Sequence, residues 1–74
     1  MSYSEWIDLA ALKVKEHLKQ GSKKAPDVNR SNVLWAASIL EIRRALVWYG
    51  DKLYMVNYNT NTEETVVDVY TREE

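Results

Sequence analysis

The chain has 74 residues, a formal net charge of −1 and no cysteine. This length accommodates one domain, residues 1–74, and excludes a second core. No disulfide can form. With no cysteine and a single histidine, His17, the chain lacks the ligands for a structural zinc site of the usual Cys/His kind. Stability must therefore come from an efficient apolar core or from self-association, and three Trp and five Tyr residues provide material for both.

The apolar segments of the chain are short. No stretch approaches the 18 or so consecutive apolar residues of a membrane-spanning helix. Residues 1–5 also lack the basic and apolar regions that open a secretory signal peptide. Together with the lack of cysteine, these features predict a cytoplasmic protein that does not associate with a membrane.

Residues 5–20 are the first expected element, an amphipathic helix. Ser2 and Glu5 have the spacing of a capping box, and Ser4 is a rival N-cap. Gly21 is a natural residue to follow the last helical turn, because glycine adopts the left-handed conformation that often ends a helix. These signals predict both ends of the helix.

The apolar residues of this expected helix gather on one side when they are placed at about 100° per residue. Leu9 and Leu12 point away from that side, and two large apolar residues together on an outer face indicate a contact patch. The core-facing stripe contains Tyr3, Trp6, Ile7, Ala10, Ala11, Val14 and Leu18.

Residues 29–47 are expected to form a second helix, after a loop at 21–31 that contains Pro26. A helix that is apolar over so much of its circumference is usually central to a fold, so we expect it to be the core element with Trp35 buried at its heart. Its two adjacent apolar stripes are Val28, Trp35, Ile39, Ile42 and Leu46, and Val33, Ala36, Leu40 and Val47.

The composition favours strands beyond about residue 48. Segments 53–58 and 65–70 are rich in β-branched and aromatic residues, and turn-forming residues separate them, which predicts a hairpin. A third strand at 47–49, turned at Gly50-Asp51, is an alternative to a helix that continues to about residue 46. The predicted fold class is therefore α+β: two helices followed by a two- or three-stranded antiparallel β-meander, with the second helix central.

No motif in the sequence assembles a catalytic, metal-binding or cofactor site. His17 is the one side chain suited to acid–base chemistry near neutral pH, and no GxSxG or related nucleophile motif accompanies it. With only Gly21 and Gly50, the sequence contains neither a P-loop nor a GxGxxG motif, the two glycine-rich motifs that bind phosphates. The sequence predicts that the protein is not an enzyme and uses no cofactor.

The predicted function is a small protein-interaction module with an accessory or regulatory role, which forms a homodimer or binds another protein through Leu9 and Leu12. The alternative is nucleic-acid binding. Residues 13–30 carry six Lys or Arg against two acidic residues, whereas 51–74 carry two against six. The basic segment would contact phosphates and exposed tyrosines would stack on bases. The residues assigned to this alternative are Lys19, Lys23, Lys24, Tyr54 and Tyr58.

Overall fold

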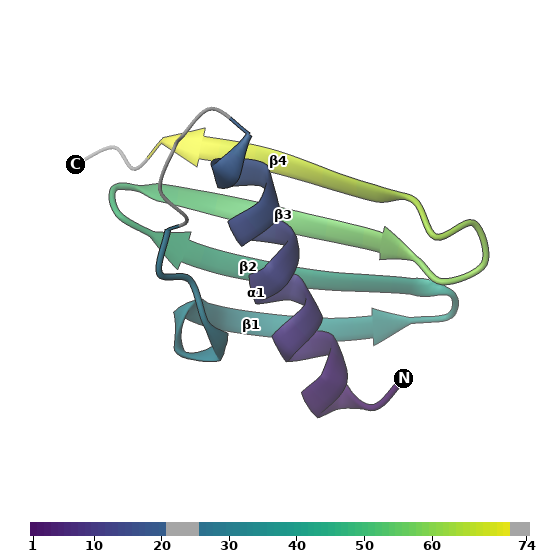
Figure 1. Ribbon diagram of the computed structural model, residues 1–74. Helices are drawn as coiled ribbons and strands as arrows, with labels where there is room; N and C mark the ends of the chain where they lie inside the picture. The colour runs from purple at the N-terminus through teal and green to yellow at the C-terminus, as the bar shows by residue number, and fades with distance from the viewer. Residues whose placement is uncertain (21–25, 72–74) are drawn as a thin grey trace.

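The computed structural model describes residues 1–20 and 26–71, which form one helix packed on a four-stranded antiparallel sheet (Figure 1). The strands pair in the order β1-β2-β3-β4, so each strand lies beside its neighbour in the chain. No helix in these two ranges is long and apolar enough to cross a membrane. The elements are α1 (Tyr3–Lys19), the 3-10 turn η1 (Arg30–Asn32), β1 (Val33–Ile39), β2 (Ile42–Tyr49), β3 (Lys52–Asn59) and β4 (Thr65–Thr71).

The expected second helix at 29–47 is wrong, because this segment forms η1, β1 and β2. Successive side chains of a strand point to opposite faces. In β2 both faces carry apolar residues, so the sequence lacks the apolar–polar alternation that usually identifies a strand, and the segment resembles a helix with two apolar stripes. The turn between the strands is Leu40-Glu41, which contains no Gly, Pro or Asn to mark it. The sheet consequently has four strands instead of two or three, and 46–49 belong to a strand.

The β1–β2 turn places a bulky residue in an unfavourable backbone conformation. Leu40 has a φ of 51°, in the left-handed region that a branched side chain seldom occupies. Its side chain is 88% exposed, so no packing within the described residues compensates for this geometry. The next turn differs, because Gly50 supplies its positive φ of 65°, at the turn that the sequence left open as an alternative.

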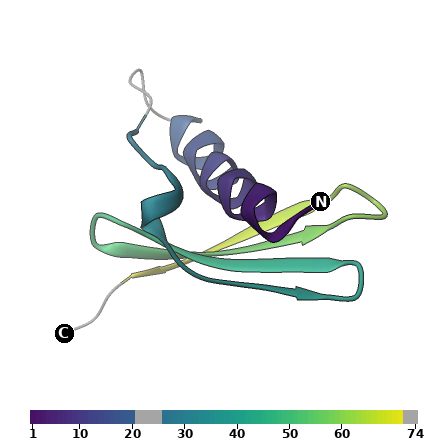
Figure 2. The same ribbon diagram turned by 90° about the horizontal axis from the view of Figure 1, so that it is seen from below.

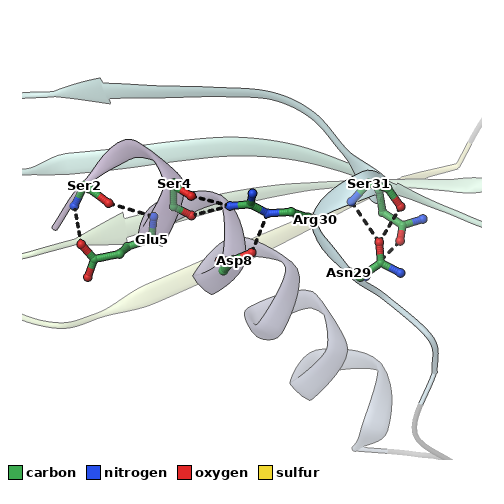
Figure 3. A network of polar contacts seen from close by, with 8 residues as sticks. Ser2, Ser4, Glu5, Asp8, Asn29, Arg30 and Ser31 are labelled. Atoms are coloured by element: carbon green, nitrogen blue, oxygen red, sulfur yellow. Dashed lines mark hydrogen bonds and ion pairs between the residues drawn. The ribbon is translucent and has the colours of Figure 1, made fainter.

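Helix α1 begins with the capping box that the sequence predicted. The backbone N–H of Glu5 donates to Ser2 Oγ, and the backbone N–H of Ser2 donates to Glu5 Oε1, each at 3.1 Å (Figure 3). Two hydrogen bonds with Ser2 hold the pKa of the exposed Glu5 carboxyl below its ordinary value. The bond with the Ser2 backbone has the larger effect and the bond with the Ser2 side chain the smaller one. The helix start is therefore fixed by local polar contacts.

Arg30 in η1 connects the start of the sheet to the first turns of α1. Its Nε donates to Asp8 Oδ1 at 2.8 Å, and its Nη2 donates to both the carbonyl oxygen and the hydroxyl of Ser4 (Figure 3). Asn29 caps η1 through its Oδ1, which accepts from the backbone N–H of Ser31 at 3.0 Å. These contacts set where the chain enters β1 relative to the helix.

The core lies between α1 and one face of the sheet (Figure 2). Trp6 is its largest fully buried side chain; its Nε1 donates to the carbonyl oxygen of Arg44 at 2.9 Å and its ring stacks on Tyr58 at 6.0 Å between centroids. The expectation that Trp35 is buried at the heart of the domain is wrong, since 46% of this residue is exposed. The buried residues are Trp6, Ala10, Ala11, Val14, Val28, Ala45, Val47, Tyr54 and Val56.

Candidate functional site

The face of the sheet turned away from α1 is the most distinctive surface of the domain, because the helix and η1 both lie on the opposite side (Figure 2). Side chains alternate between the two faces along each strand, so the residues between the core positions belong to the face turned away from α1. The antiparallel register arranges them in rows across the strands. These rows are Trp48, Leu53 and Tyr70; Trp35, Leu46, Met55 and Asp68; Ala37, Arg44, Asn57 and Val66; and Ile39, Ile42 and Asn59. We call this surface the open face.

Apolar side chains are exposed at both edges of the open face. Trp35 and Ile39 on β1 are 46% and 54% exposed, and Val66 and Tyr70 on β4 are 55% and 54% exposed. Four strands of this length span roughly 25 Å by 19 Å, or about 475 Å² of flat area. This area is that of the whole face, which also carries the polar residues Arg44, Asn57, Asn59 and Asp68. Exposed apolar patches of several hundred Å² on monomeric soluble proteins are often functional.

Two charged side chains, Arg44 and Asp68, lie on the open face within the described part of the chain. Arg44 is on the inner strand β2, in the row of Asn57, whereas Asp68 is on the edge strand β4, in the row of Met55. Two strand spacings and one row, about 12 Å between the backbones, therefore separate them. No ion pair joins them within the described residues. Arg44 Nε is shielded from solvent and has no hydrogen-bond partner in the described residues.

A shallow hollow lies on the other side of the sheet, between the last turns of α1 and β4. Lys13, Glu16, His17, Gln20, Thr65 and Val67 line it. The His17 ring meets Tyr54 edge-on at 6.2 Å between centroids. Within residues 1–20 and 26–71, no group of three or more His, Cys, Asp or Glu side chains is arranged to hold a metal ion.

The predicted helix patch of Leu9 and Leu12 is divided in the structure. Leu9 is half-buried and packs against the core, whereas Leu12 is 48% exposed. The sequence placed both leucines on the outer side because a regular 100° step leaves Leu9 near the boundary of the apolar stripe. Of the two leucines in the predicted patch, Leu12 is therefore the one that remains exposed.

The residues assigned to nucleic-acid binding are spread over different environments. Tyr54 is 3% exposed and lies in the core, where burial first, and then the nearby Asp51 and Tyr49, raise the pKa of its phenol. Tyr58 is half-buried, stacked on Trp6 and approached by Lys13 Nζ at 5.7 Å from its ring centre. Lys19 is exposed in the last turn of α1. Lys23 and Lys24 lie outside the described residues.

The open face was not singled out from the sequence. Its signal is the alternation within β3 and β4, where Met55 lies between Tyr54 and Val56. Alternation shows which residues share a face, but the identity of the covered face depends on where α1 docks. No protein-family model matches the chain, and no curated protein or solved structure is significantly similar to it.

Proposed function

We propose that this protein is a non-enzymatic interaction module that self-associates through the open face, with a second copy of the chain as its partner. The observation that carries this proposal is the set of apolar side chains that the open face exposes at both of its edges, on β1 and on β4. Trp, Tyr, Met and Arg are the residue types enriched at protein–protein interfaces, and all four occur on this face.

The size of the open face favours a second sheet as its partner. A second copy presents a face of equal size and shape. A two-fold contact would bury about 950 Å² of flat area, and more once side-chain relief is included. This lies near the roughly 1,000 Å² that a specific interface needs, so we expect a dimer in the micromolar range.

Sedimentation equilibrium of the wild type from about 1 to 500 µM tests the proposal directly, and we expect a monomer–dimer equilibrium. The informative pair of variants is Trp35→Lys and Leu12→Lys, because the two residues are 46% and 48% exposed and lie on opposite sides of the molecule. Lysine is well tolerated on an edge strand such as β1. Trp35→Lys should remain monomeric, whereas Leu12→Lys should dimerise as the wild type does.

Two outcomes contradict this function. A wild type that is monomeric at every concentration shows that the open face does not bind a second copy. If Leu12→Lys abolishes the dimer while Trp35→Lys preserves it, association occurs through the outer face of α1, as the sequence alone predicted. Circular dichroism spectra of both variants provide the control that each is folded.

A further inference from the structure

The charged residues of the open face indicate how two copies would be oriented in a dimer. This inference about orientation rests on the proposed self-association. Arg44 lies on an inner strand, so a sheet docked over the face would remove its guanidinium from water. A charge buried without a partner is strongly destabilising. Its Nε already lacks a hydrogen-bond partner within the described residues. The docking surface must therefore supply an acceptor at this point.

A second copy offers one carboxylate on the described part of the same face, Asp68. We infer that the two chains pair through reciprocal Arg44–Asp68 contacts, in which Arg44 of each copy binds Asp68 of the other. Guanidinium and carboxylate form charge-assisted, often bidentate hydrogen bonds, which offset the desolvation of both groups. The pairing also explains how one cation and one anion that form no ion pair within the described part of one chain can both be satisfied in a dimer.

The strand register defines the symmetry axis of such a dimer. A two-fold axis between the sheets places Arg44 of each copy opposite Asp68 of the other if it passes over the midpoint of the line joining these two residues, at right angles to that line. That midpoint falls on β3, the strand between β2 and β4, at the level of Val56. Met55 and Asn57 flank Val56 and point to the open face, so each lies next to the axis and meets its own copy.

A charge-exchange experiment tests the pairing. In Arg44→Asp, the introduced carboxylate of each copy would face Asp68 of the other, and in Asp68→Arg two guanidinium groups would face each other. Each variant alone should therefore dimerise at least about thirtyfold more weakly than the wild type. In an equimolar mixture, a heterodimer of the two variants has opposite charges at both contacts, one of them with its polarity exchanged. The heterodimer should therefore bind more tightly than the homodimer of either variant. Sedimentation equilibrium at low salt measures all four samples.

The outcomes separate this inference from the proposed function. A monomeric wild type contradicts self-association itself. A wild-type dimer combined with a mixture no tighter than the single variants preserves the self-association and refutes the pairing. An Arg44→Asp variant that dimerises like the wild type also refutes it.

A second measurement leaves both charges in place, which matters if Arg44→Asp does not fold. The chain has no cysteine, so Asn57→Cys introduces a single thiol next to the inferred axis. Facing sheets lie about 10 Å apart, beyond the reach of a disulfide, so a short bismaleimide is the suitable crosslinker. Asn57→Cys should give a covalent dimer in high yield and the control Leu12→Cys should not; equal yields would overturn the inferred geometry.

Discussion

Replacing Trp6 with phenylalanine should show which tryptophan holds the fold together. Trp6 is fully buried and its Nε1 donates to the carbonyl oxygen of Arg44 at 2.9 Å. Loss of this bond costs about 1 kcal/mol, and loss of the indole atoms with the cavity left behind costs about 2 kcal/mol. A domain of this size has a total stability of about 3–5 kcal/mol. About 0–2 kcal/mol therefore remains, and we expect Trp6→Phe to be up to half unfolded in water or to melt at a much lower denaturant concentration.

Trp35→Phe provides the matched control, because it makes the same chemical change at a residue that is 46% exposed. Substitutions at such surface positions usually change stability by less than about 0.5 kcal/mol. Urea unfolding followed by circular dichroism, at a protein concentration low enough for the monomer to dominate, gives both values. If Trp35→Phe costs as much as Trp6→Phe, the assignment of Trp6 as the central core residue is refuted.

Two further predictions concern the backbone and the titration of the core. Leu40→Gly should relieve about 1–2 kcal/mol of left-handed strain, offset in part by the entropy of glycine, and raise Tm by roughly 5 °C in a thermal melt; an unchanged or lower Tm would contradict the strain. Burial raises the folded pKa of Tyr54 above its ordinary value of 10.0, so the wild type should lose stability as pH rises beyond about 10, and Tyr54→Phe should lose less. Urea midpoints between about pH 8 and 11 measure this difference, and parallel profiles would argue against it.

The two ends of the chain were predictable from local signals. Ser2 and Glu5 predicted the capping box at which α1 begins. The apolar stripe of that helix contains four of the nine core residues in the described part of the chain. The hairpin of β3 and β4 followed from β-branched and aromatic residues around a polar turn. In both regions the local preference agrees with the tertiary structure, so pattern and propensity were sufficient.

The middle of the chain was not predictable in this way. Between residues 33 and 47 many residues favour helices, including Leu, Ala, Glu and Arg, and tertiary pairing overrides that preference. The turn at Leu40-Glu41 has none of the usual turn residues, so nothing divided the segment in two. The candidate site shares this origin: strands with two apolar faces look like a buried helix, and one of those faces is the open face.

The order of the strands has a consequence for the route by which the protein folds. Because each strand pairs with the next one in the chain, the sheet can assemble as three successive hairpins, each closing a short loop. Packing of α1 alone requires contacts between distant parts of the chain, such as Trp6 with Tyr58. Chains dominated by local contacts fold rapidly. We therefore expect fast refolding for a β-rich protein, with the hairpins formed early and the helix docking late in the transition.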